Sequence, residues 1–252
     1  MIRVGLRGAK GALPEHARSR GYPVLVSAAR LWTGRSWRIP LEGLDAALDS
    51  GAYGVFLRGG DYPWTIDQYA ELVAAYPWAW CASMDVIGDP VASALNYGRM
   101  AGLGVIPVWQ TLACARAMPA PFAAIGGVRT ARPLRLRRLL DEFALIAPQT
   151  CLHLFGVTGA AWWGVRDRPS VVSTDSTAWD LHARLWCRKN GEPHSMHWRC
   201  HFMSAWLERQ EGRARTVVLP GAPASSQLEM FGCPRESNPV LSSDNNKGRK
   251  EL

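Results

Sequence analysis

Short apolar runs alternate with longer stretches of helical periodicity along most of the chain. Amphipathic helices are expected over residues 66–75, 90–102, 133–146 and 181–188. Other apolar runs have the length of strands and are bounded by turn residues; they cover 23–28, 44–49, 79–85, 105–110, 122–126, 151–155 and 171–174. Because strands separated by helices are joined by crossover connections, the pattern predicts a parallel sheet in an α/β domain.

The residues at the ends of these runs favour a barrel over a doubly wound sheet. Several runs end in a polar or small residue that is followed by a turn, at Asp49, Asp85, Gln110, Gly126 and Asp175. In a barrel of parallel strands such ends converge on one face, whereas a doubly wound sheet gathers them at one crevice. We therefore predict a TIM-like (β/α)8 barrel over residues 1–218, followed by a flexible, polar tail over 219–252.

The composition excludes two classes of protein. Of the 252 residues, 48% are hydrophobic and 20% are charged, which is too apolar for a mainly disordered chain. No stretch approaches the roughly 18 consecutive apolar residues of a membrane span. The first residues also lack the apolar core of a secretory signal, so we expect a cytoplasmic protein that does not engage a membrane.

The chain is basic, with 29 Lys and Arg against 21 Asp and Glu and a formal net charge of +8. This balance is typical of proteins that bind nucleic acids, although solubility alone would explain it equally well. Two arginine clusters are candidate phosphate contacts, the first interleaved with Trp32 and Trp37 and the second at the start of a predicted helix. Their members are Arg30, Arg35, Arg38, Arg129, Arg132 and Arg135.

Three aspartates, Asp49, Asp85 and Asp175, stand at predicted strand ends. A single Asp at such a position often caps the turn or helix that follows. Three of them, each after an apolar run and beside small residues such as Ser50 and Gly51, indicate instead a pocket in which a ligand approaches the backbone.

Short segments around these aspartates follow one another in a fixed order. They are Asp-Ser-Gly-Ala-Tyr at 49–53, Met-Asp at 84–85, Val-Trp-Gln at 108–110, Ala-Ile-Gly-Gly-Val at 124–128, Leu-Phe-Gly-Val at 154–157 and Ser-Thr-Asp-Ser at 173–176. As an ordered set they resemble the queuine/archaeosine tRNA-guanine transglycosylases. The resemblance runs over residues 44–180, more than half of the chain.

The chain also departs from the tRNA enzymes. It is shorter, it lacks their Cys-x-Cys-x-x-Cys…His zinc motif, and it lacks the Pro-Thr-Arg segment that follows their nucleophile. In these respects it resembles the DpdA family, whose phage- and island-encoded members exchange guanine in DNA for a 7-deazaguanine such as preQ0. Base exchange in tRNA is the alternative, and a catalytically silent nucleic-acid-binding barrel is a further one.

The resemblance implies base exchange through a covalent intermediate. Asp175 would be the nucleophile at the sugar C1′, and Asp49 would protonate the leaving guanine and later deprotonate the incoming base, much as paired carboxylates act in retaining glycosidases. Tyr53 is the candidate that stacks on a flipped base, whereas we expect Trp109 to pack inside the fold. The residues implied to bind the base are Ser50, Gly51, Tyr53, Asp85, Gln110, Gly126 and Gly127.

No cofactor is expected. The spacing of Cys187, Cys200 and His201 matches no familiar zinc signature, so zinc is only an alternative there. The expected partners are DNA and a free 7-deazaguanine base, and the resemblance adds an ATPase that opens the duplex. In the tail, the segment from Gln227 to Phe231 resembles the peptide by which bacterial proteins dock on the sliding clamp, with an ordinary polar tail as the alternative.

Overall fold

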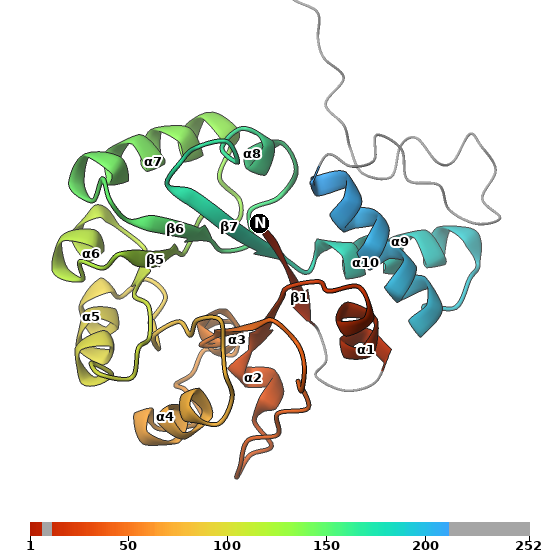
Figure 1. Ribbon diagram of the computed structural model, residues 1–252, viewed down its shortest axis with the longest axis horizontal. Helices are drawn as coiled ribbons and strands as arrows, with labels where there is room; N and C mark the ends of the chain where they lie inside the picture. The colour runs from red at the N-terminus through yellow and green to blue at the C-terminus, as the bar shows by residue number, and fades with distance from the viewer. Residues whose placement is uncertain (7–11, 212–252) are drawn as a thin grey trace, which may run out of the picture.

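The computed structural model describes residues 1–6 and 12–211, which form a single parallel sheet with helices packed around it (Figure 1). The strands are β1 (Ile2–Leu6), β2 (Val24–Ser27), β3 (Ala46–Asp49), β4 (Val108–Trp109), β5 (Phe122–Ile125), β6 (Cys151–Leu154) and β7 (Val171–Ser176). The helices are α1 (Ala12–Ser19), α2 (Ala28–Leu31), α3 (Ala52–Leu57), α4 (Ile66–Ala74), α5 (Pro90–Arg99), α6 (Leu112–Ala117), α7 (Pro133–Ile146), α8 (Gly159–Trp163), α9 (Ala178–Asn190) and α10 (Met196–Gln210).

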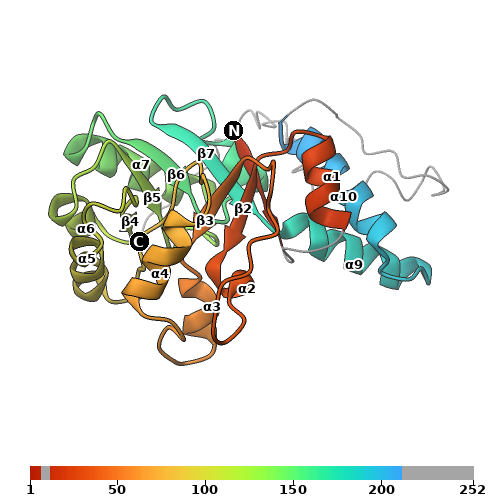
Figure 2. The ribbon, with the colours of Figure 1, turned by 60° about the horizontal axis from the view of Figure 1, so that its bottom comes forward.

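The sheet is curled. Its strand order is β3-β2-β1-β7-β6-β5-β4, and every paired strand is parallel to its neighbour. The two edge strands are linked through residues 79–83, because Leu48 forms a parallel bridge with Cys81 and Ala82 forms one with Ile106, just before β4. Helices α4 to α7 lie around the outside of this curl (Figure 2). The predicted α/β class with a TIM-like parallel sheet is therefore confirmed.

Residues 79–85 were expected to form a strand, and this prediction is wrong in extent. Only isolated bridges form there, although the Ala82 N–H donates to Leu48 O at 2.8 Å. The Tyr69 hydroxyl donates to Ala82 O at 2.8 Å, so a side chain takes a carbonyl that a regular ladder would use. Strand pairing in this segment is therefore limited to the bridges at Cys81 and Ala82.

Strand β1 was not predicted, because Arg3 and Gly5 interrupt its apolar pattern. In the structure Arg3 is only 4% exposed; its Nη1 lies 3.0 Å from Asp45 Oδ1, and its guanidinium lies 5.8 Å from the Trp80 ring centroid. A buried charge is tolerated when it is paired, which is how this position stays inside the sheet.

Side chains on the two faces of the strands form separate cores. Ala123 and Ile125 of β5 join the large core between sheet and helices, whereas Ala124 joins a small cluster with Val108 and Ile106. Since successive side chains of a strand alternate between its faces, the small cluster lies on the inner, concave face of the curl. The inner face is therefore filled with side chains below the strand ends that hold the site.

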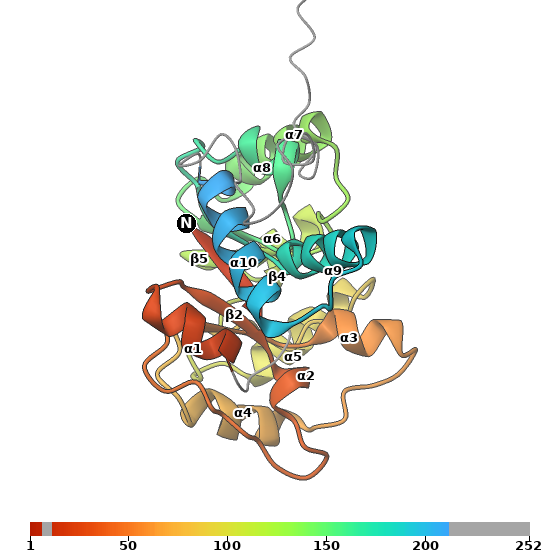
Figure 3. The same cartoon turned by 90° about the vertical axis from the view of Figure 1, so that its right-hand side faces the viewer.

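Helices α9 and α10 pack against each other beside α1 and β1 (Figure 3). The sequence predicted only 181–188 as helix; α9 is longer and ends at Gly191, whose φ of +68° suits a left-handed C-cap. Helix α10 was missed because it has no clean apolar stripe: buried residues occur all round its second half.

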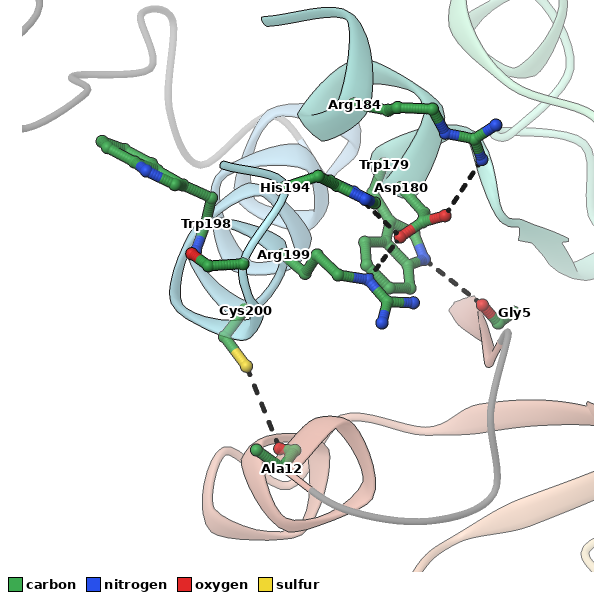
Figure 4. Close-up of polar contacts among 10 residues, drawn as sticks. Gly5, Ala12, Trp179, Asp180, Arg184, His194, Trp198, Arg199 and Cys200 are labelled. Atoms are coloured by element: carbon green, nitrogen blue, oxygen red, sulfur yellow. Dashed lines mark hydrogen bonds and ion pairs between the residues drawn. The ribbon is translucent and has the colours of Figure 1, made fainter. Parts of the chain in front are cut away.

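A buried ion cluster anchors this helix pair (Figure 4). Asp180 is 2% exposed, and its Oδ1 accepts from Arg199 Nε at 2.7 Å, with His194 Nε2 at 3.6 Å. Its Oδ2 lies 3.5 Å from Arg184 Nη2. The neighbouring Trp179 donates from Nε1 to Gly5 O at 3.3 Å, which ties the start of α9 to β1.

The predicted tail 219–252, its candidate clamp peptide and the end of the predicted domain at 212–218 lie outside the described residues. No helix within residues 1–6 and 12–211 has the length and apolar character needed to cross a membrane.

Asp180→Ala should lower the free energy of unfolding by about 3 kcal/mol, because it removes the buried carboxylate that pairs with the partly buried Arg199 and so links α9 to α10. The matched control is Asp141→Ala, which removes an exposed pair with Arg168 at 2.6 Å and should cost at most about 1 kcal/mol. Urea denaturation at neutral pH measures both values. Equal losses in the two variants would contradict an anchoring role for Asp180.

Candidate functional site

The three predicted aspartates lie together on the face formed by the carboxyl ends of the strands. Asp49 is the last residue of β3, Asp175 lies near the end of β7, and Asp85 follows the bridging segment 79–83. Their carboxyl groups are near enough that the charges of Asp85 and Asp175 both raise the pKa of Asp49. The structure thus brings together residues that are far apart in the sequence.

Asp49 has the properties of a general acid and base. Burial, and then the neighbouring carboxylates Asp85 and Asp175, raise its pKa to about 7 from the ordinary 3.8. Hydrogen bonds from the Gly51 backbone and the Ser27 side chain act in the opposite direction. A carboxyl with a pKa near neutrality can give and take a proton at the pH of the cell.

Asp85 is held by the residues that were predicted to bind a base with it. Ser50 Oγ donates to its Oδ1 at 2.9 Å, and Gln110 Nε2 lies 3.3 Å from its Oδ2. Burial raises the pKa of Asp85 to about 6, and the bonds from Ser50 and Gln110 lower it. The Gln110 amide is itself oriented, because its Nε2 donates to Val86 O at 2.9 Å and its Oε1 accepts from the Gly88 N–H at 2.8 Å.

Tyr62 is a site residue that the sequence did not reveal. Its hydroxyl donates to Asp85 O at 2.7 Å and lies 3.2 Å from Ser50 Oγ, so it fixes the backbone that carries Asp85 beside Ser50. Its ring packs 5.5 Å from Trp64, which lies 5.2 Å from Trp37. No local pattern marks Tyr62, because it reaches the site from a turn that has no periodicity.

His153 is the second residue that was missed. It lies on β6 with its Nε2 3.3 Å from Asp175 Oδ1, and the Gly156 N–H donates to the same oxygen at 2.9 Å. An apolar run gives no sign that one polar member faces a carboxylate on the neighbouring strand.

Glycines let the backbone come close to the carboxylates. Gly51 has a φ of +88°, and a Cβ there would lie 3.2 Å from both Ala29 N and Ser27 Oγ, so a side chain would displace the donor to Asp49. Gly127 has a φ of +74° and open space around it, next to Gly126 at the end of β5. Gly127 thus leaves space at the end of β5, and a role for Gly126 and Gly127 in holding a base stays a prediction.

Tyr53 and Arg129 lie across the mouth of the site. The guanidinium of Arg129 is 5.7 Å from the Tyr53 ring centroid, and a Cβ on Gly156 would lie 3.2 Å from Arg129 Cγ. Tyr53 belongs to α3, which follows β3, whereas Gly156 follows β6. Arg129 therefore spans from one side of the carboxylate face to the other, and Tyr53 remains 52% exposed.

The candidate phosphate contacts occupy the same face. One cluster lies in and just after α2, directly beyond β2, and the other lies beyond β5 at the start of α7. All six side chains are exposed: Arg30, Arg35, Arg38, Arg129, Arg132 and Arg135.

Trp109 packs inside the fold, as predicted. It is fully buried and stacked on Phe143 at a centroid distance of 5.6 Å, and its Nε1 donates to Met118 O at 3.0 Å. It is therefore not available to stack on a base.

Cys187, Cys200 and His201, the candidate zinc ligands, are not arranged around a common point in the structure. Cys187 is buried in the small core of α9 and α10, Cys200 Sγ lies 3.9 Å from Ala12 O, and the His201 ring packs near Trp198. Across residues 1–6 and 12–211, no three His, Cys, Asp or Glu side chains are grouped so that they could hold a metal ion.

Comparison with known proteins gives no family. No family model matches the chain, and no curated protein matches it. Among solved structures it is similar to the YdjI aldolase from Escherichia coli K12, with 10% sequence identity and a TM-score of 0.46 over 84% of this chain and 89% of that chain. The function of this protein therefore has to be inferred from its own residues.

Asp49→Asn should stabilise the protein at pH 8 and not at pH 5. Because the pKa of Asp49 is raised to about 7, the folded protein binds more protons than the unfolded chain between about pH 4 and 7, so its stability falls as the pH rises through that window. The variant avoids a buried charge and should gain about 1 to 3 kcal/mol at pH 8. Thermal denaturation at the two pH values measures the gain.

The control for this measurement is Asp61→Asn, a change of the same type at an exposed position. It should shift Tm equally at both pH values. A lower Tm for Asp49→Asn than for wild type at pH 8 would show that the Asp49 carboxylate is stabilised rather than strained in the fold.

Proposed function

We propose that this protein is a DNA guanine transglycosylase similar to the DpdA family, which exchanges guanine for a 7-deazaguanine base such as preQ0. The observation that carries the proposal is the convergence of Asp49, Asp85 and Asp175 on one face, with the pKa of Asp49 near 7. We also propose that the curled sheet is a (β/α)8 barrel in which residues 79–83 act as the additional strand.

In the first half of the reaction, a carboxylate oxygen of Asp175 attacks C1′ of the deoxyribose. The bond from C1′ to guanine N9 breaks, its electrons go to the base, and the protonated Asp49 supplies a proton to the departing guanine. The product is a covalent ester between Asp175 and C1′. In the second half, Asp49 takes a proton from the incoming base, whose nitrogen displaces Asp175 from C1′.

The proposed base pocket uses groups whose chemistry suits a guanine edge. Asp85 offers carboxylate oxygens to N–H donors, and Gln110 supplies an amide already fixed beside it. The Gly126 and Gly127 backbone can approach the opposite edge, and exposed Tyr53 can stack on a base that has been flipped out of the helix.

The basic surface around the mouth supports a polyanionic substrate. The exposed arginines after β2 and β5 lie on the same face as the three aspartates, so they can hold phosphates while the carboxylates meet the sugar and base. A catalytically silent binding barrel would not need a carboxyl group whose pKa lies near 7, so the raised pKa of Asp49 favours an enzyme over this alternative. The proposed reaction belongs in the cytoplasm of a bacterial or phage-infected cell, together with an ATPase that opens the duplex.

Purified protein incubated with labelled preQ0 or guanine should transfer label into duplex DNA and not into tRNA. Asp175→Ala should abolish the covalent adduct, and Asp49→Ala should slow exchange by about 100-fold without loss of DNA binding. Denaturing gel electrophoresis detects the adduct, and Asp61→Ala at an exposed position is the control. Label in tRNA would overturn the choice of substrate, and unchanged exchange by Asp175→Ala would overturn the mechanism.

Replacement of Arg30, Arg35 and Arg38 by Gln should weaken DNA binding and flatten its salt dependence. If each contacts one phosphate, the slope of log Kd against log salt should fall by about 3. The control replaces three exposed arginines near the opposite face by Gln: Arg99 and Arg116 in the last turns of α5 and α6, and Arg20 directly after α1. Fluorescence anisotropy with duplex DNA measures both, and an equal change in the control would show that the effect is one of net charge.

A further inference from the structure

The Asp175 carboxylate is held through one of its two oxygens. The Gly156 N–H donates to Oδ1 at 2.9 Å, and His153 Nε2 lies 3.3 Å from the same Oδ1. Within the described part of the chain, the donors that reach this carboxylate all reach Oδ1. The arrangement fixes the plane of the carboxylate and leaves Oδ2 for another role.

His153 is itself fixed by the protein around it. It is fully buried on β6, its Nδ1 lies 2.8 Å from Ser173 Oγ, and its ring packs against Trp80 and Phe155 at centroid distances of 4.7 and 4.9 Å. Both ring nitrogens therefore meet polar groups of β7, and the ring also packs against two aromatic side chains. An imidazole held in this way has little freedom to rotate.

A β-bulge in β7 brings Ser173 and Asp175 into contact with His153. Leu152 pairs with Val171, but the next residue, His153, pairs with Ser173, so β7 carries the additional residue Val172 at that point. This bulge shifts the alternation of β7, and Ser173 and Asp175 then face His153 together. Bulges of this kind re-aim side chains beside active sites.

The hydrogen-bond pattern specifies one tautomer. A carboxylate oxygen accepts, so Nε2 carries the proton that His153 gives to Asp175, and Nδ1 then accepts from the Ser173 hydroxyl. Burial, first of all, lowers the pKa of His153, and the charges of Arg3 and the Met1 amino group lower it further, while Asp175 raises it. Burial outweighs the effect of Asp175, so the pKa of His153 is lowered, which favours the neutral imidazole.

We infer that His153 is a positioning residue, whose Nε2–H fixes Oδ1 of Asp175 so that Oδ2 is aimed at C1′ of the nucleotide. This inference rests on the proposed function, in which Asp175 is the nucleophile. Packing alone would not explain the residue, because Leu or Phe would fill an apolar interior without the cost of burying an imidazole. A misdirected nucleophile loses about 100-fold in rate for an error on the order of 1 Å.

Three substitutions separate positioning from packing. His153→Gln places an amide N–H near the position of Nε2 and should keep the bond to Asp175. His153→Asn places its polar atoms near Nδ1, toward Ser173, and should lose the bond to Asp175, as should His153→Leu. The Gln and Asn variants form the matched pair, because both bury an amide at the same site.

The first measurement is the single-turnover rate of adduct formation with duplex DNA, beside the Kd for the same DNA and the Tm. The Asn and Leu variants should form adduct about 10- to 100-fold more slowly with unchanged Kd, and the Gln variant should recover most of the rate. Equal losses in Gln and Asn, or losses that follow Tm rather than the retained N–H, would overturn the inference.

The second measurement does not depend on activity. Nitrogen-15 NMR of the His153 ring should show a protonated Nε2 and an unprotonated Nδ1 in the wild type, and Asp175→Ala should shift the Nε2 signal and speed exchange of its proton. If wild-type protein forms no adduct while the ring shows this tautomer, the proposed function fails and the fixing of Asp175 by His153 stands. A proton on Nδ1 in the wild type would overturn the positioning inference whatever the activity.

Discussion

Repulsion among carboxyl groups that share one face of the sheet is the constraint on which the rest of the site depends. Asp49, Asp85 and Asp175 cannot all be ionised there without opposing charge or donors. Each of the three carboxyl groups receives a different set of hydrogen-bond donors. Asp85 receives donors from Ser50 and Gln110, and Asp175 receives a backbone N–H and an imidazole. Asp49 receives hydrogen bonds from Gly51 and Ser27, but burial and the neighbouring carboxylates outweigh them and raise its pKa to about 7.

In the proposed reaction, these different surroundings would separate the chemical tasks. A carboxyl whose pKa lies near 7 can give and take a proton, and a carboxylate held by N–H donors can be positioned to attack. The arginines proposed to bind DNA remain exposed beyond β2 and β5, whereas Arg3 is buried on the inner face of the sheet, where it pairs with Asp45. Under the proposed function, the exposed arginines would meet the phosphates of the substrate while the carboxylates meet its sugar and base.

The three aspartates could be predicted from the sequence, whereas the residues that hold them in place could not. The aspartates could be found because strand ends are marked by a change from apolar to polar residues. Helix α7 has its predicted bounds because it begins at Pro133 and its buried residues recur with helical spacing. Tyr62 and His153 could not be found, since their roles come from contacts with residues distant in sequence. Strand β1 escaped prediction because the group that neutralises Arg3, Asp45, lies beyond the neighbouring strand β2.

The bulge at Val172 has a consequence for how β7 can change. Val171 packs in the outer core, while Ser173 and Asp175 face inward, so odd-numbered residues of one strand lie on opposite faces. Strict alternation would put all three on one face. The strand thus holds one residue more than its pairing with β6 requires. Loss of Val172 would restore a regular ladder with Asp175 still facing inward, whereas loss of Thr174, the one residue between Ser173 and Asp175, would turn the carboxylate toward the helices. The face on which Asp175 lies therefore depends on the number of residues in β7 as well as on their identity.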